Sequence, residues 1–207
     1  MATRALPVAV YHLVDAANWD RVRRDGLKCT ADLIGRDNAA CGEHRPRAIA
    51  APDGSYIRDQ APMPPSALAR CLDPPLVPAD WYRMLNGLVF FWFDRARVDR
   101  HVRAAHSRQQ HLLTIDVARL VERYAAALRV TPFNTGNAKR KPASRGPRSF
   151  VPVDEWLANG WIFECQAGGK PRPPSHRPAE LVSLVPIPDV LELCVGIELI
   201  EPKGSIR

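Results

Sequence analysis

The segment "VAVYHLVDAANWDRVRRDGL", residues 8–27, joins an expected strand to an expected helix. Its first seven residues are rich in β-branched and aromatic side chains, which is typical of a strand. Asp15 is then placed to cap a helix that packs Trp19 against the core and ends at Gly26. His12 is therefore expected at the end of a strand, just before a helix.

The rest of the chain mixes strands and helices without strict alternation. Strands are expected at 88–94, 111–117, 179–185 and 193–201, and helices at 64–72, 80–86, 95–106 and 117–128. Pro186 and Pro188 indicate a bend between the last two strands. This order favours an α+β fold with a largely antiparallel sheet, in a single domain spanning residues 1–207.

The run "LVFFWFD", residues 88–94, is the strongest strand signal in the chain because of its aromatic and β-branched content. It is apolar throughout, which predicts burial on both faces. Trp92 is accordingly expected in the core and not on a surface that stacks against a ligand.

Composition excludes several classes of protein. The chain has 207 residues, 46% of them apolar, and its sequence shows neither a run of 18 or more apolar residues nor a signal-like start. These features favour a soluble, cytoplasmic protein with no membrane partner. The five cysteines lack metal-finger spacing and are expected as reduced core thiols, and His101, His106 and His111 are not spaced to share a helix face. We expect no metal, and the sequence contains no dinucleotide-binding, P-loop or nucleophile-elbow motif.

Basic residues exceed acidic ones by 29 to 22, a net charge of +7, and the excess is concentrated in two segments. The segment "NAKRKPASRGPRSF", residues 137–150, contains no acid and holds Lys139, Arg140, Lys141, Arg145 and Arg148. The segment 168–178 adds Lys170, Arg172 and Arg177. Phosphates attract such loops through counterion release, so nucleic acid is the predicted partner. A solvated loop without a partner is the alternative.

Four blocks of the chain, in order, resemble the DarT-like ADP-ribosyltransferases. In that family, as at residues 10–27, a strand ending in a Tyr-His pair leads into a helix and a Gly-Leu step. The other blocks are "HRPRAIAAPDGSYIRDQAPM" (44–63), "FNTGNAKRKPASRGPRSF" (133–150) and "RPAELVSLVPIPDVLELCVGIEL" (177–199). An uncharacterised DarT-related group is similar over about residues 10 to 199, including "WYRMLNGLVFFW" (81–92). The resemblance implies an ADP-ribosyltransferase-like fold: α+β, with a mixed, mostly antiparallel split sheet, flanking helices and long loops.

The resemblance also implies a site and a cofactor, NAD. It places Glu180 at the catalytic glutamate and Arg45 at the catalytic arginine, with Arg47 as the near competitor. His12 would hold the nicotinamide ribose. The remaining implied NAD-binding residues are Asn18, Thr30, Arg47 and Arg58, and the implied substrate-binding residues are Asn134, Lys139, Arg140, Lys141, Arg145 and Arg148.

Elementary chemistry explains why such residues are needed. Breaking the bond between nicotinamide and ribose develops positive charge on the sugar, which a carboxylate such as Glu180 can stabilise. The same carboxylate can take a proton from an incoming nucleophile. An arginine such as Arg45 offers a planar fork to a pyrophosphate, which a lysine does not reproduce.

The leading hypothesis is an NAD-dependent mono-ADP-ribosyltransferase that modifies an acceptor, expected to be a nucleic-acid base of DNA or RNA. Two alternatives stay open: an NAD-dependent RNA 2′-phosphotransferase, and a non-catalytic nucleic-acid-binding module on the same scaffold. Whether the chain is a toxin with an antidote protein as its partner also stays open.

Overall fold

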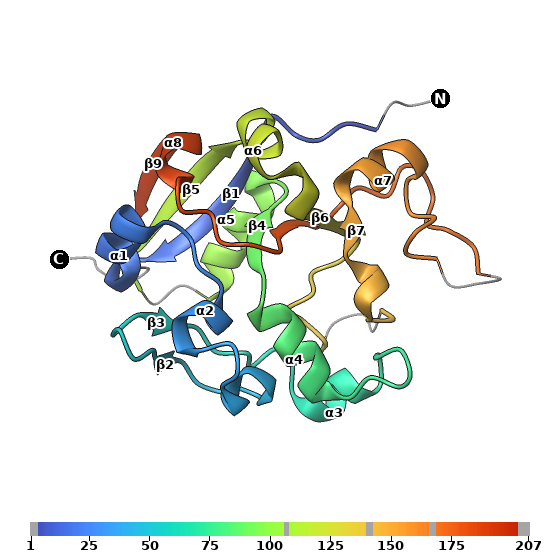
Figure 1. Cartoon of the computed structure of the whole chain (residues 1–207), viewed down its shortest axis with the longest axis horizontal. Helices are drawn as coiled ribbons and strands as arrows, with labels where there is room; N and C mark the ends of the chain where they lie inside the picture. The colour runs from blue at the N-terminus through green and yellow to red at the C-terminus, as the bar shows by residue number, and fades with distance from the viewer. Residues whose placement is uncertain (1–3, 106–107, 140–142, 166–168, 203–207) are drawn as a thin grey trace.

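A seven-stranded antiparallel sheet forms the centre of the computed structural model, which describes residues 4–105, 108–139, 143–165 and 169–202 (Figure 1). The order of its strands is β7-β6-β8-β4-β1-β5-β9. Their bounds are β1 (Ala9–Asp15), β4 (Val89–Trp92), β5 (Gln110–Asp116), β6 (Leu128–Thr131), β7 (Val151–Pro152), β8 (Glu180–Ser183) and β9 (Cys194–Ile200). A separate hairpin joins β2 (Ile49–Ala50) to β3 (Tyr56–Ile57). The predicted α+β class with an antiparallel sheet is confirmed.

The sheet is weakly joined in its middle. Strand β1 pairs with β5 along its whole length, from Ala9 opposite Asp116 to Asp15 opposite Gln110. Between β1 and β4, by contrast, the paired residues are Tyr11 and Trp92 alone. The two halves β7-β6-β8-β4 and β1-β5-β9 therefore separate on either side of this contact.

Short helices surround the sheet. The α-helices are α1 (Trp19–Asp25), α2 (Thr30–Ile34), α3 (Pro65–Ala69), α4 (Pro78–Asn86), α5 (Arg95–Ala105), α6 (Val117–Tyr124), α7 (Val153–Asn159) and α8 (Val190–Leu193). The 3-10 turns are η1 (Ala16–Asn18), η2 (Ala39–Gly42), η3 (Ala125–Ala127) and η4 (Pro147–Ser149). Asp15 accepts a hydrogen bond from the Ala17 amide at 3.0 Å, and Gly26 ends α1 at φ 74°. The predicted end of the helix at Gly26 is confirmed, whereas Asp15 caps the 3-10 turn η1 that leads into α1, whose own N-cap residue is Asn18.

The apolar core has two parts. The larger includes Val10, Phe91, Leu113 and Leu181 from the central strands, each almost fully buried. The smaller gathers residues of α3 and α4, which lie side by side in Figure 1, and includes Leu68, Trp81 and Tyr82. Cys29, Cys41 and Cys71 are buried thiols within these cores, as predicted, whereas Cys165 and Cys194 are only half-buried.

The prediction that β4 is buried on both faces is wrong. Val89 and Phe91 are buried in the core, but Phe90 and Trp92 on the opposite face are half-buried and line a cavity. Apolar residues occur in cavity walls as well as in the core, so the continuous apolar run did not distinguish a cavity-lining face of β4 from a buried one.

The bend around Pro186 and Pro188 is confirmed, but the short helix α8 that follows it was not predicted. Leu27 and Ile187 exchange two backbone hydrogen bonds of 2.9 Å across this bend. Gly26 lies so close that a Cβ atom would be 2.2 Å from the Ile187 oxygen. The glycine that ends α1 is therefore required by the packing of the bend as well as by its positive φ.

Candidate active site

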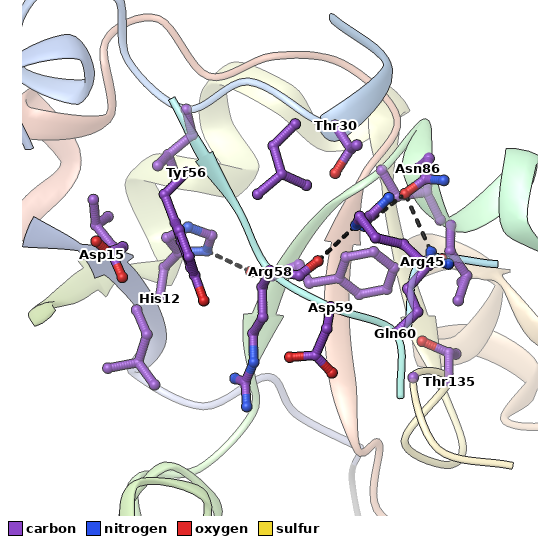
Figure 2. A pocket seen from close by; sticks show the side chains of 18 of the residues that line it. His12, Asp15, Thr30, Arg45, Tyr56, Arg58, Asp59, Gln60, Asn86 and Thr135 are labelled. Atoms are coloured by element: carbon purple, nitrogen blue, oxygen red, sulfur yellow. Dashed lines mark hydrogen bonds between the residues drawn. The ribbon is translucent and has the colours of Figure 1, made fainter. Parts of the chain in front are cut away.

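A cavity of about 450 Å³ lies at the split in the sheet, and Figure 2 shows part of its lining. Segments far apart in the sequence contribute to its wall. The predicted site residues that line it are His12, Asn18, Thr30, Arg45, Arg58, Asn134 and Glu180. Ligand sites commonly have volumes of roughly 300–1,000 Å³, so this cavity is large enough for a small-molecule ligand.

Glu180 opens β8 and is 6% exposed. Its Oε2 atom accepts three hydrogen bonds, from the Thr131 hydroxyl at 3.0 Å, the Thr135 hydroxyl at 2.9 Å and the Thr135 amide at 3.1 Å. Burial raises the pKa of Glu180 above its ordinary value, and these hydrogen bonds oppose that shift because they stabilise the charged form. The result is a fixed, largely desolvated carboxyl group at the cavity wall.

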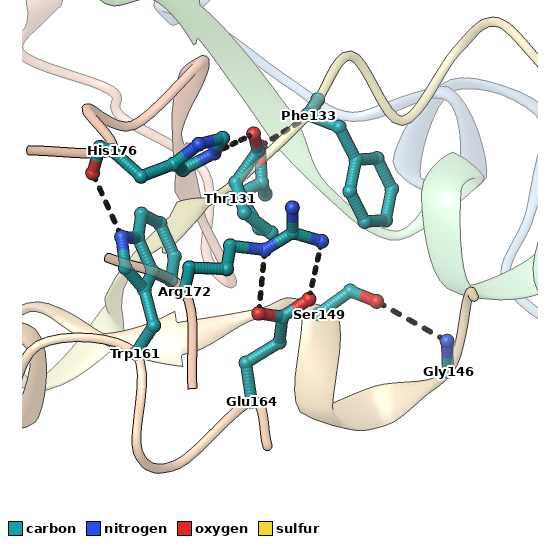
Figure 3. Close-up of polar contacts among 9 residues, drawn as sticks. Thr131, Phe133, Gly146, Ser149, Trp161, Glu164, Arg172 and His176 are labelled. Atoms are coloured by element: carbon teal, nitrogen blue, oxygen red, sulfur yellow. Dashed lines mark hydrogen bonds and ion pairs between the residues drawn. The ribbon is translucent and has the colours of Figure 1, made fainter. Parts of the chain in front are cut away.

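The loop that carries Thr135 is held in place by side chains from the segment between α7 and β8 (Figure 3). His176 bonds through Nε2 to the Pro132 carbonyl at 2.7 Å, and its own carbonyl accepts a 2.8 Å bond from Trp161 Nε1. Arg172 makes two 2.7 Å contacts with Glu164 and lies 5.7 Å from the centroid of the Phe133 ring. In the second basic segment, Arg172 is thus paired with an acid and has a structural role.

Arg45 is 9% exposed and is held by its neighbours. Its Nε donates to the Arg58 carbonyl at 2.7 Å, and its Nη2 donates to Asn86 Oδ1 at 3.4 Å (Figure 2). Asn86 Oδ1 also accepts from Gln60 Nε2 at 3.3 Å, and Asn86 Nδ2 donates to the Cys41 carbonyl at 2.9 Å. These contacts fix the plane of the guanidinium in the cavity wall.

The acid whose charge acts on Arg45 is Asp59, which also lines the cavity. Burial lowers the pKa of Arg45, yet an arginine side chain stays protonated in a protein. Among the described residues, no carboxylate lies within ion-pair distance of this guanidinium. A buried cation that forms no ion pair favours an anionic ligand, because burying a charge is costly unless it is paired.

His12 bridges the gap between the two halves of the sheet. Its Nδ1 lies 2.7 Å from the Phe90 carbonyl oxygen, which can only accept, so Nδ1 carries the proton. Burial lowers the pKa of His12 and favours the neutral ring. The side chain thus replaces a backbone bond that β1 and β4 do not make at this point, and leaves Nε2 as an acceptor.

The hairpin β2–β3 covers part of the cavity through Tyr56. Asn18 Nδ2 donates to the Tyr56 carbonyl at 2.8 Å, and Asn18 Oδ1 accepts from the Tyr56 amide at 2.7 Å. Arg108 lies 4.1 Å from the centroid of the Tyr56 ring and forms bonds of 2.5 and 2.9 Å to Asp15. The Asn18 amide group is therefore engaged in holding the hairpin, although the residue lines the cavity as predicted.

Of the remaining predicted NAD-binding residues, two line the cavity and one does not. Thr30 and Arg58 line the cavity, and Arg58 contacts His101 through its guanidinium. Arg47 is exposed and does not line the cavity. Between the two arginines left open by the sequence, the cavity therefore favours Arg45.

The predicted substrate-binding residues differ in whether they reach the cavity. Asn134 lines the cavity, and Lys139 and Arg148 are exposed outside it. Arg145 is 1% exposed and turns inward, donating to the carbonyls of Ala143 and Asn137 at 2.7 Å each. Its role in this structure is to hold the loop, so it is not available to a substrate. Arg140 and Lys141 lie outside the described residues.

Several residues that line the cavity or hold its side chains were missed from the sequence. Gln60 and Asn86 hold Arg45, Thr131 and Thr135 hold Glu180, and Tyr56 forms part of the roof. Polar residues beside a charged site residue carry no sequence signal of their own, because their roles arise from tertiary contacts. The sequence contains one signal for Asn86, because the helical pattern of α4 directs this polar residue inward, where it needs hydrogen-bond partners.

Neither a metal-binding cluster nor a membrane-spanning helix occurs among the described residues. Within the described residues, no group of three or more His, Cys, Asp or Glu side chains is arranged to hold a metal ion. In the same part of the chain, no helix has the length and apolarity needed to cross a membrane.

The fold and the cavity define the class of the protein: an antiparallel α+β chain with a buried carboxyl group, a buried arginine and a histidine around one cleft. A family model described as "Family of unknown function (DUF7002)" matches residues 8–194, and the chain belongs to this family. No curated protein and no solved structure matches the chain. None of these comparisons links it to the DarT-like transferases.

Proposed function

We propose that the protein is an NAD-dependent mono-ADP-ribosyltransferase whose acceptor is a nucleic-acid base. The observation that carries the proposal is that Glu180, Arg45 and His12, from distant parts of the chain, line one cavity. Each of the three has the chemistry that the reaction requires of it.

The residues of the cavity fit NAD. Arg45 supplies a buried positive charge that forms no ion pair with a described residue, which suits a pyrophosphate. His12 offers Nε2 as a hydrogen-bond acceptor, which suits a ribose hydroxyl. NAD would supply the sugar carbon that is transferred and nicotinamide as the leaving group.

Glu180 is the catalytic residue of this proposal. Its negative charge stabilises the positive charge that develops on the sugar, and the low polarity of a buried site strengthens that attraction. The hydrogen bonds from Thr131 and Thr135 fix one carboxylate oxygen, so the group needs little reorganisation during the reaction. The same carboxylate can take the proton that the acceptor loses.

The test is the release of nicotinamide from NAD by the wild-type protein and by Glu180→Gln. We expect the variant to lose about 10²-fold or more in rate, because removal of one preorganised electrostatic group typically costs this much. Glu122→Gln, an exposed glutamate on α6, is the matched control and should keep the wild-type rate. Equal release by Glu180→Gln and the wild type would refute the proposal.

The same assay separates the alternative transferase by its product. A 2′-phosphotransferase would release nicotinamide only with 2′-phosphorylated RNA and would remove the phosphate from it. An ADP-ribosyltransferase would attach the label of adenine-labelled NAD to its acceptor. Dephosphorylated RNA without labelled acceptor would therefore favour the phosphotransferase.

A further inference from the structure

The two edge strands of the main sheet differ in character. At one edge, β7 has two residues and includes Pro152, which has no backbone N–H to offer a further strand. At the other edge, β9 has seven residues without proline, lysine or arginine, and β5 is its partner in the described part of the chain. Proteins usually shorten or charge their edge strands, because an open edge pairs with other chains. Strand β9 has neither the short length nor the proline that protects β7.

The side chains of β9 that face solvent are mostly apolar. Val195, Ile197 and Leu199 are 60%, 50% and 49% exposed. Leu199 lies directly opposite His111 of β5, so both side chains are on the same face of the sheet. The His111 ring in turn stacks on Trp19, with 4.1 Å between the ring centroids. The apolar surface at this edge therefore continues from β9 across β5 to the start of α1.

We propose that two copies of the chain associate by antiparallel pairing of β9 with its counterpart, which joins the two sheets into one. Ile197 is the middle residue of β9, and a two-fold axis beside it places Ile197 opposite its counterpart in the second copy. Val195 then lies opposite Leu199, and Gly196 lies opposite Glu198. The same surface of both copies forms the contact, as in most symmetric dimers.

The side chains of β9 are complementary to themselves in this register. Apolar residues face one another at Ile197 and at the pair formed by Val195 and Leu199. Glu198, the one charged residue of β9, faces a glycine. Its charge is also offset within its own chain, because Arg95 of α5 makes contacts of 2.9 and 3.1 Å with it. An axis beside Glu198 would instead oppose two acids, and like charges directly opposite each other are destabilising.

A second copy fits this edge better than a peptide from another protein. Peptides that add a strand to a sheet gain their specificity from pockets that receive alternate side chains. No residue of β9 lines the cavity at the split of the sheet or the smaller cavity of about 160 Å³ beside it. The edge thus offers a flat row of apolar side chains, which a second β9 matches through symmetry alone.

Sedimentation velocity of the full chain over a wide range of concentrations tests this proposal. The mass of the wild type should rise with concentration toward twice the chain mass of 23.0 kDa. Ile197→Lys should raise the dissociation constant of the dimer about 100-fold or more, because it removes two apolar side chains from the contact and opposes two like charges. Ile162→Lys is the matched control and should leave the constant unchanged. Ile162 is 60% exposed and follows α7, which lies on the opposite side of the molecule from β9 in Figure 1.

Cysteine cross-linking tests the register itself. Opposed Cα atoms in an antiparallel pair lie about 4.5–5.5 Å apart, within the range of about 4.4–6.8 Å that a disulfide spans. Ile197→Cys should therefore form a covalent dimer in oxidised glutathione. In Val195→Cys, the two new thiols are four residues apart along the paired strands, about 13 Å, which is too far. This variant should cross-link no more than the wild type, whose own cysteines set the background.

The outcomes decide the proposal without reference to NAD. A wild type that keeps the mass of one chain at every concentration overturns it, and would leave β9 to an extended segment of a different protein. A dimer that persists in Ile197→Lys with the wild-type dissociation constant also overturns it, because the contact must then lie elsewhere. If circular dichroism shows that Ile197→Lys does not fold, Ile197→Cys decides, and cross-linking no greater than that of Val195→Cys refutes the pairing.

Discussion

Glu180 combines a negative charge with near-complete burial, and this combination has a cost for folding. Its pKa is raised in the folded state, so at a pH between the ordinary and the raised value the folded protein holds a proton that the unfolded chain has lost. The contribution of Glu180 to stability therefore falls as pH rises through this interval. Above it, the folded protein carries a desolvated charge. Such a cost is typical of a residue kept for function.

We therefore expect Glu180→Gln to be more stable than the wild type at neutral pH. The glutamine keeps an oxygen that can accept from Thr131 and Thr135 but carries no charge. The difference in the free energy of unfolding should shrink as pH falls toward the ordinary carboxyl pKa of 4.5. Urea unfolding of both proteins between pH 4 and 8 measures it, and a variant less stable than the wild type at every pH would contradict this reading.

Arg45 should determine the affinity for NAD. Arg45→Lys removes the planar fork while keeping the charge, and a hydrogen bond to a charged group contributes about 1.5–3 kcal/mol. The dissociation constant for NAD should therefore rise by about 10-fold or more, as calorimetric titration would show. Arg47→Lys changes an exposed arginine outside the cavity and serves as the control. A larger loss in Arg47→Lys than in Arg45→Lys would reverse the assignment.

At the scale of elements, the split between β1 and β4 creates the site and also leaves a weak point. The two strands pair at Tyr11 and Trp92, and the His12 ring makes the next contact by bonding to the Phe90 carbonyl. A residue expected to bind a ligand thus also joins the halves of the sheet.

His12→Ala should destabilise the fold by about 1–3 kcal/mol, the usual cost of leaving a buried carbonyl without its donor. His12→Asn places an amide donor at a similar distance from the backbone and should recover part of this loss. Urea unfolding of the three proteins provides the measurement. If His12→Ala unfolds at the wild-type urea concentration, the bridge contributes nothing.

The elements show what the sequence can and cannot predict. The strands and helices with strong patterns were predicted, because local signals specify them. The capping role of Asp15 and the end of α1 at Gly26 were predicted for the same reason. The two faces of β4 were not distinguished, because apolar side chains suit a cavity wall and a core equally. Arg145 was predicted to contact substrate because sequence alone does not reveal that neighbouring carbonyls bind its guanidinium.

At the scale of the whole molecule, charge and cavity are separate features. Exposed Lys139, Arg148 and Lys170 lie outside the cavity that Glu180 lines. In the proposed function, they would attract the backbone of a nucleic acid, while the cavity would hold the reacting nucleotide. The net charge of +7 supports such attraction without specifying a sequence.

Binding of single-stranded DNA should therefore weaken steeply with salt. The slope of log K against log salt concentration should decrease in magnitude by about 0.7 when Lys139→Gln removes one phosphate contact. Arg23 is an exposed residue of α1, which lies on the opposite side of the molecule from β7 in Figure 1. The control variant Arg23→Gln should therefore leave the slope unchanged. Fluorescence anisotropy across a salt series provides the data, and equal slopes for wild type and Lys139→Gln would exclude Lys139 from the interface.

The central claim is that one cavity brings NAD to Glu180 and Arg45. A crystal structure of Glu180→Gln soaked with NAD tests it most directly, because the variant should bind NAD without consuming it. We predict density for the nicotinamide ribose beside residue 180 and His12, with the pyrophosphate at Arg45. An empty cavity at saturating NAD, or NAD bound elsewhere on the molecule, would contradict the account.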